Sequence, residues 1–180
     1  MEKIISRLEL IGEKLNKASV IFLGVQMIIL SIAVVGQVFL RFFGTSINWA
    51  TEFSCYLFIW MTMLGSAVAS KYLMHIGVDI LVERIRGKAR KIVLLISHLL
   101  FLAGLLIFIT AGMQYTVQQI ASLTVTFGIS KAWFYVSMPV CGMLMAYYTF
   151  VQLLEIIHYD KIIIPKENPA YNPDSKGVLS

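Results

Sequence analysis

The acidic residue Glu52 is the first candidate for chemistry in this sequence, because it borders a long apolar run. No charged residue occurs between Glu52 and Lys71. A carboxylate beside hydrocarbon is costly, and such acids often belong to ion pathways or proton relays. The alternative is an acid that lies at the membrane surface and anchors the end of a helix. From the sequence, the two interpretations weigh about equally.

The histidines and cysteines are the other candidates for metal, haem or proton chemistry. His75 and Asp79 lie four residues apart and can share one face of a helix, but a metal site needs more than two ligands. His98 lies inside an apolar run with no second histidine at matching depth, so a hydrogen-bonded packing role is favoured over a proton relay or haem ligand. Cys55 and Cys141 also lie in apolar runs, where we expect small buried side chains rather than a disulfide. We expect no catalytic residue, no metal and no cofactor.

The composition is far too apolar for a soluble domain of this length. Hydrophobic residues make up 58% of the chain, charged residues 14%, and the mean hydropathy is +0.80. These values predict an integral membrane protein rather than an enzyme of the aqueous phase. The net charge of +5 does not indicate a nucleic-acid partner, since the basic residues cluster beside the apolar runs and not in a nucleotide-binding motif.

Four apolar runs are each long enough to cross a bilayer, which takes about 18 or more residues. Ahead of the first run, apolar side chains recur at helical spacing and predict an amphipathic helix on the membrane surface. A cleavable signal peptide is the rival, but the run that follows is longer than a signal core and lacks a small-residue cleavage site before Arg41. We therefore expect an all-α, integral membrane, antiparallel four-helix bundle with amphipathic interfacial helices. Within one membrane domain over 1–160, the expected spans are 18–40, 49–70, 92–112 and 132–154, the interfacial helices are 3–17 and 77–87, and 161–180 form a flexible cytoplasmic tail.

The distribution of basic residues predicts the orientation of these spans. Of the 15 Lys and Arg residues, all but Arg41 and Lys131 lie on the side that holds both termini and the loop between the second and third spans. Because basic residues are retained on the cytoplasmic side, we expect both termini in the cytoplasm of a bacterial inner membrane.

The second span carries residues that predict contact with another protein. Four of them follow one stripe at spacings of three, four and four, and two small residues further on allow another backbone to approach closely. The stripe is Trp49, Glu52, Tyr56 and Trp60, and the two small residues are Gly65 and Ala69.

Two amides and a proline shape the other spans. Gln26 and Gln37 lie on one face of the first span, where hydrocarbon favours a hydrogen-bonding neighbour. That neighbour is either a partner protein or another helix of this chain, and the second is slightly favoured. Pro139 lies inside the fourth span, where its ring and missing N–H should bend the helix.

A family resemblance runs through the second span and the turn that follows it. The residues that carry it are Trp49, Glu52, Trp60, Gly65, Ala67, Ala69, His75, Ile76, Val78 and Asp79. This pattern resembles the small permease subunit of tripartite ATP-independent periplasmic (TRAP) transporters, and a weaker likeness extends over the four spans and 133–142. Thr51 stands where the family often has the first of two acids, which counts against any role that needs both carboxylates.

The resemblance implies a scaffold rather than a self-sufficient transporter. In that family a large permease subunit carries the substrate and sodium sites, a soluble periplasmic protein delivers an organic acid such as a dicarboxylate or sialic acid, and the small subunit braces the large one. It also implies that His75 and Asp79 are structural fasteners of their turn. An independent four-span transporter or channel is the alternative, although the chain shows no internal repeat and only one acid at the edge of a span. A membrane oxidoreductase is disfavoured because paired histidines at matching depth are missing from the sequence.

Overall fold

The computed structural model of the protein describes residues 2–43, 48–73 and 88–159, and these residues are almost entirely helical. The long helices are α1 (Glu2–Phe42), α2 (Asn48–Leu73), α4 (Lys88–Gln118) and α6 (Ser137–Tyr159), and the single turn α5 (Ala132–Tyr135) precedes α6. All four long helices are long and apolar enough to cross a membrane. The predicted all-α membrane fold with four spans is therefore confirmed.

Residues 3–17 and 18–40, which the sequence assigns to two elements, belong to one continuous helix. Neither proline nor a run of turn-forming residues separates them, so nothing in the local chemistry ends a helix at Lys17. With 41 residues, α1 is about 60 Å long, roughly twice the thickness of a bilayer's hydrocarbon core. The expected helix 77–87, the tail 161–180, and the pair His75 and Asp79 lie outside the described residues.

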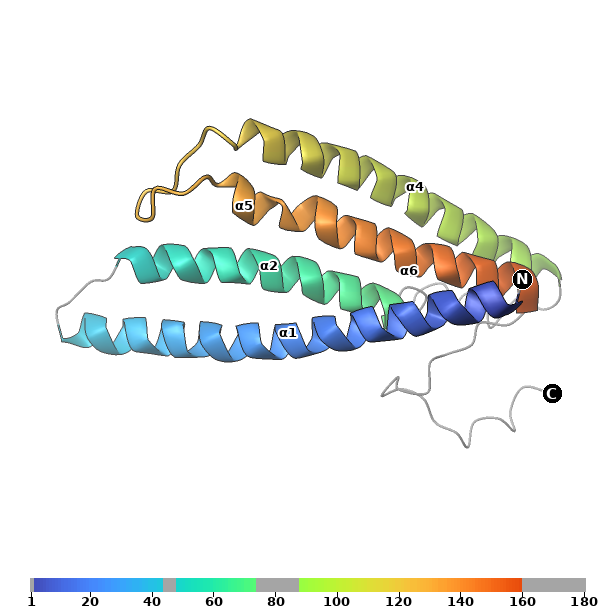
Figure 1. Ribbon diagram of the computed structural model, residues 1–180, viewed down its shortest axis with the longest axis horizontal. Coiled ribbons are helices and arrows are strands. Elements are labelled where there is room, and N and C mark those ends of the chain that lie inside the picture. Colours follow the sequence, from blue (N-terminus) through green and yellow to red (C-terminus); the bar gives the residue numbers. More distant parts are fainter. Residues whose placement is uncertain (1, 44–47, 74–87, 160–180) are drawn as a thin grey trace.

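The four long helices stand in a row rather than around a common axis (Figure 1). α1 packs on α2, α2 on α6, and α6 on α4. Consecutive spans alternate in direction, but the central neighbours α2 and α6 run parallel to each other. One consequence of the row is that, over most of its length, each long helix leaves at least two faces uncovered by the described residues. Large apolar side chains such as Ile21 and Ile32 of α1 are exposed there, which suits lipid rather than water.

Two glycines allow α4 and α6 to approach closely. A Cβ atom added at Gly142 would lie 2.8 Å from Cγ1 of Ile109 and 3.2 Å from Cδ1 of Phe108. A Cβ atom at Gly112 would lie 3.0 Å from Cβ of Met138. Small residues at such crossings are typical of helix pairs in membranes, because the contact there depends on close packing rather than on exclusion of water.

The fourth span is interrupted shortly before Pro139. Helix α5 ends at Tyr135 and α6 begins at Ser137, with Val136 between them. Pro139 thus lies in the first turn of α6, where a missing backbone N–H breaks no helical hydrogen bond. The buried hydroxyl of Ser137 donates to the carbonyl of Phe134 at 2.8 Å across the interruption.

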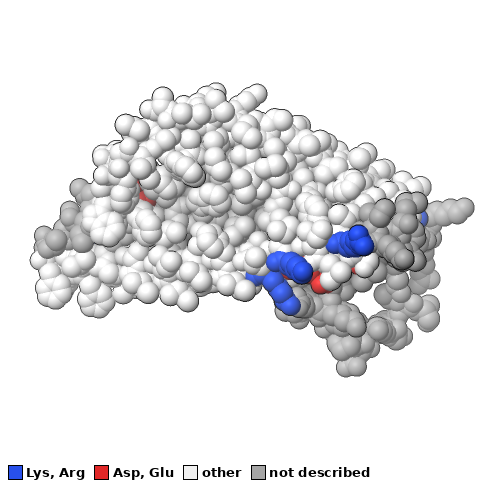
Figure 2. Space-filling model, in the orientation of Figure 1, with Lys and Arg blue, Asp and Glu red and all other residues white. Residues whose placement is uncertain are grey.

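The helices converge and are tied together by polar contacts at the end where α1 begins. The hydroxyl of Tyr147 donates to the carbonyl of Leu8 at 2.8 Å, and the amide of Gln152 donates to the carbonyl of Lys71 at 3.0 Å. On the face drawn in Figure 2, Lys and Arg side chains gather in this half of the molecule, while the rest of that face is uncharged apart from an isolated acidic spot. The basic end and the apolar body thus agree with a helix row that crosses a bilayer and emerges at this end.

Candidate functional site at Glu52

The carboxylate of Glu52 is engaged by three donors of its own chain. The Tyr56 hydroxyl and the backbone N–H of Val125 donate to Oε1 at 2.9 Å and 3.1 Å. The backbone N–H of Thr126 donates to Oε2 at 2.9 Å. Hydrogen bonds to an ionised acceptor are among the stronger ones in proteins. Glu52 therefore fastens the beginning of α2 to the connection between α4 and α5.

That connection contains a small hairpin, here called the 122–131 hairpin. The N–H of Thr124 donates to the carbonyl of Ile129, and the N–H of Lys131 donates to the carbonyl of Ser122, both at 2.8 Å. Gly128 has a φ of +64°, a conformation that glycine adopts without strain. From the sequence, these residues are expected only to connect the spans 92–112 and 132–154. The usable signal was the alternation of polar and apolar residues over 122–127, followed by Gly128, which is typical of a hairpin strand that ends in a turn.

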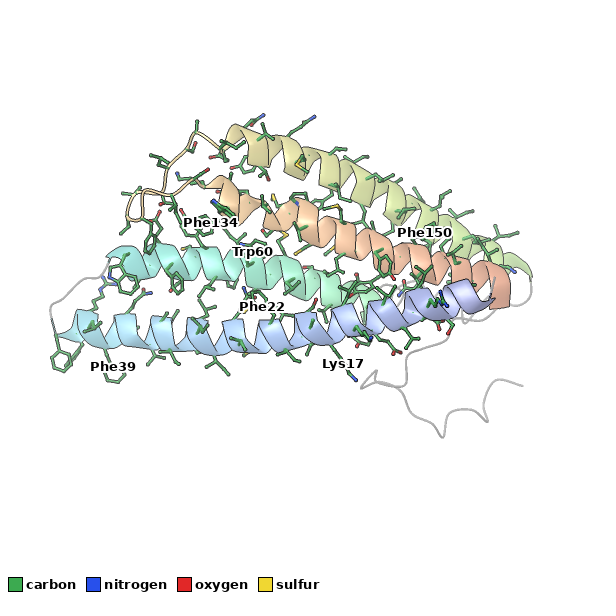
Figure 3. The ribbon with its side chains drawn as sticks, viewed as in Figure 1. Lys17, Phe22, Phe39, Trp60, Phe134 and Phe150 are labelled. Carbon is green, nitrogen blue, oxygen red and sulfur yellow. The ribbon has the colours of Figure 1, made fainter. Side chains whose placement is uncertain are left out.

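The predicted stripe on α2 makes its contacts with this same region. The Trp49 ring meets the Phe127 ring edge to face, with centroids 6.5 Å apart. The Tyr56 ring stacks on Phe134 with centroids 3.5 Å apart, and Figure 3 shows Phe134 on the side of α5 that faces α2. Trp60 is half-buried. The first three residues of the stripe, Trp49, Glu52 and Tyr56, therefore contact other parts of the same chain.

Gly65 and Ala69 lie further along α2. No atom lies within 4 Å of the position that a Cβ atom would take at Gly65 among the described residues, and Ala69 is half-buried. Phe58, Thr62 and Ser66 are exposed on the same side of the helix. This side of α2 is uncovered within the described chain and is made mostly of small residues.

The two glutamines of α1 differ in their surroundings. The Gln37 amide donates to Oγ of Ser54 at 2.8 Å, and its oxygen accepts from the hydroxyl of Thr51 at 3.2 Å. Gln37 therefore binds α1 to α2 within the chain, which is the alternative that the sequence slightly favoured. Gln26 is buried, with 5% of its surface exposed, and its Oε1 atom has no hydrogen-bond partner within the described ranges.

The remaining described candidates for chemistry are one histidine and two cysteines, of which Cys55 lies three residues from Glu52 on α2. His98 is fully buried, with Nδ1 2.8 Å from the carbonyl oxygen of Leu94, as expected of a packing residue. Cys141 is buried, but Cys55 is exposed, contrary to the prediction, because no described residue covers the side of α2 that carries it. No group of three His, Cys, Asp or Glu side chains suited to a metal ion occurs in residues 2–43, 48–73 and 88–159.

Comparisons with known proteins agree with this architecture. A family model described as "Tripartite ATP-independent periplasmic transporters, DctQ component" matches residues 30–158. The sialic acid TRAP transporter small permease protein SiaQ of Vibrio cholerae is 28% identical over 122 residues, which cover 68% of this chain and 69% of that protein. A putative TRAP transporter small permease protein of Haemophilus influenzae is 29% identical over 138 residues, or 74% of this chain and 79% of that protein.

A third relative is much longer than this chain. The sialic acid TRAP transporter permease protein SiaT of Haemophilus influenzae is 28% identical over 110 residues. These residues cover 61% of this chain but only 18% of that protein.

Proposed function

Since the chain belongs to the DctQ-component family of TRAP transporters, we propose that it braces a large permease subunit during sodium-coupled uptake of an organic acid. With four spans it is a multi-pass membrane protein. In the proposed orientation, both termini face the cytoplasm of a bacterial inner membrane, because all but two of the 15 basic residues lie on that side.

The observation that carries this proposal is the partial match to the long permease SiaT. A segment similar to this chain makes up only 18% of that polypeptide. In that protein, the matched segment and a much longer remainder form one permease polypeptide. Two parts of one polypeptide stay close to each other while the protein functions. We therefore expect this separate chain to assemble with a corresponding large subunit.

The chemistry of the spans favours a framework role over ion transport. Glu52 is the one charged residue in 18–40, 49–70, 92–112 and 132–154. Both of its carboxylate oxygens already accept hydrogen bonds from the 122–131 hairpin. A coupling-ion site would need several oxygen ligands that converge on one point. The large subunit is therefore the proposed location of the substrate and sodium sites.

The uncovered side of α2 is the proposed contact with the large subunit. Gly65 has no neighbour within 4 Å of its Cβ position in the described chain, and Thr62 and Ser66 bond their hydroxyls to backbone carbonyls of α2 itself. Small residues whose polar groups are already satisfied allow a second helix to pack closely in a membrane. A helix of the large subunit is the proposed occupant.

The proposed substrate is an organic carboxylate delivered by a soluble periplasmic binding protein. One relative is named for sialic acid, and a second Vibrio cholerae relative, 30% identical over 73 residues, is named a C4-dicarboxylate TRAP transporter small permease protein. That match covers 41% of this chain and 32% of the relative. Sialic acid and C4-dicarboxylates both carry a carboxylate group, so we propose an organic carboxylate as the substrate.

Reconstitution tests the proposal. Proteoliposomes with this chain, the large subunit and the binding protein should take up substrate along a sodium gradient, and omission of this chain should abolish or strongly reduce uptake. The chain alone should give no flux. Flux through the chain alone would instead make it an independent transporter or channel.

A further inference from the structure

The 122–131 hairpin displays apolar side chains on an uncharged surface. Val125 is 93% exposed and Leu123 is 60% exposed, and Phe127 and Ile129 are also exposed. Between Gln118 and Lys131 there is no charged residue. A contiguous apolar surface of this kind is unfavourable in water and usually marks a contact with protein or membrane.

Four backbone N–H groups at the hairpin tip, those of Val125, Thr126, Gly128 and Ile129, donate hydrogen bonds inside the chain. Glu52 accepts from the N–H groups of Val125 and Thr126. Thr124 accepts from Gly128 through its carbonyl at 3.2 Å and from Ile129 through its hydroxyl at 3.1 Å. A loop with unbonded N–H groups is costly at membrane depth, whereas donors that are bonded internally remove that cost. The tip is therefore chemically suited to an apolar environment.

The hairpin also lies at the level where a membrane surface is expected. In Figure 1 it lies beside the first turn of α2 and ends short of the C-terminal end of α1. Exposed aromatic side chains continue beyond it at Phe42, the last residue of α1, and at Phe43, which follows it. Trp49 contacts Phe127, and Trp133 is exposed just after the hairpin. Tryptophan is enriched where headgroups meet acyl chains.

We propose that the 122–131 hairpin is a membrane anchor, inserted into the boundary between headgroups and acyl chains at the bilayer surface opposite the basic end. The hairpin contacts lipid, because it lies at the same height as the aromatic side chains near the end of α1 and the start of α2, which are expected at the membrane surface. A soluble partner that docks and leaves would return the apolar tip to water in every cycle. Glu52 is a positioning residue of this anchor, since its carboxylate bonds the two N–H groups at the tip.

Spin-label accessibility tests the anchor in the full chain assembled with its large subunit in nanodiscs of phosphatidylethanolamine and phosphatidylglycerol. Labels are attached at Val125→Cys and, separately, Leu123→Cys, in a background that lacks Cys55 and Cys141. Collision rates with oxygen and with a water-soluble nickel chelate are compared with those of an acyl-chain-labelled lipid and of Ser175→Cys. We expect an oxygen-to-nickel ratio near that of the lipid and several-fold above that of Ser175→Cys.

Two results would overturn the anchor. A ratio equal to that at Ser175→Cys would place the tip in water. Shielding of the label from both reagents would place it against protein, and loss of that shielding in the chain alone would identify the large subunit as the occupant.

The role of Glu52 is tested by Glu52→Gln at the same labelled positions. Glutamine keeps one acceptor oxygen but presents an NH₂ group where the second backbone N–H points. We expect nickel accessibility at Val125→Cys to rise several-fold. Thr51→Val is the matched control, since the Thr51 hydroxyl bonds Gln37 and not the hairpin, and it should leave the ratio unchanged. An unchanged ratio in Glu52→Gln would show that Glu52 does not position the anchor.

Discussion

The carboxylate of Glu52 accepts a 2.9 Å hydrogen bond from the backbone N–H of Thr126, although the two residues lie 74 positions apart. This bond and its neighbour from Val125 connect the first turns of α2 to the turn between the last two spans. The acid that the sequence singled out therefore has a structural task inside the chain.

Replacing Glu52 with glutamine should lower uptake modestly and leave its sodium dependence unchanged. The reason is that the substitution loosens the 122–131 hairpin but removes no ion ligand. Uptake measured in proteoliposomes over a range of sodium concentrations checks this. A shifted half-maximal sodium concentration in an intact complex would mean that Glu52 contributes to an ion site.

Replacing Gly142 with alanine should destabilise the packing of α6 on α4. The new methyl group would lie 2.8 Å from Cγ1 of Ile109, and overpacking of this kind typically costs about 1–3 kcal/mol. The thermal midpoint of the purified complex in detergent measures the effect. Gly104→Ala is the matched control, because nothing lies within 4 Å of that Cβ position and alanine favours the helix. Equal midpoints for the two variants would contradict the close crossing.

Replacing Gly65 with leucine should weaken assembly with the large subunit without unfolding the chain. No atom of the described chain lies within 4 Å of the added Cβ, so the cost should appear only when a partner helix packs there. Co-purification of the tagged chain with the large subunit is the measurement. Gly36→Leu, on α1 and equally free of neighbours, serves as the control. Undiminished co-purification would move the partner surface elsewhere.

The orientation can be tested with single cysteines placed on opposite sides of the bilayer. Gln118→Cys, at the end of α4, should react with an impermeant maleimide added to whole spheroplasts. Ser175→Cys should react only after the membrane is opened. These variants again lack Cys55 and Cys141. The reverse pattern of labelling would invert the proposed topology.

Local sequence patterns were enough to predict the spans but not their contacts. Uncharged runs and helical spacing identify four membrane helices, because hydrocarbon leaves few other options for the backbone. Nothing near Glu52 indicates that its partners are Val125 and Thr126, since such a contact depends on how distant spans pack. The same holds for Gly142: glycine in a span favours close packing, but only the structure distinguishes it from Gly104, which has open space around it.

For the amphipathic beginning of α1, the sequence pattern predicted the helix correctly but not its continuation into the first span. The spacing of its apolar residues predicts a helix, and residues 3–17 are indeed helical. A boundary at Lys17 was inferred from the change from charged to apolar residues. Helix geometry, however, responds to backbone-breaking residues rather than to polarity, so α1 continues through that point.

The single row of helices gives the chain the mechanical character of a plate. A rod embedded in a bilayer tips easily about any in-plane axis, because it displaces little lipid. A plate four helices wide must displace lipid along its whole width when it tips about the axis that runs along that width. With the uncovered side of α2 bound to the large subunit, as proposed, the plate broadens the complex and so raises its resistance to tilting in the bilayer.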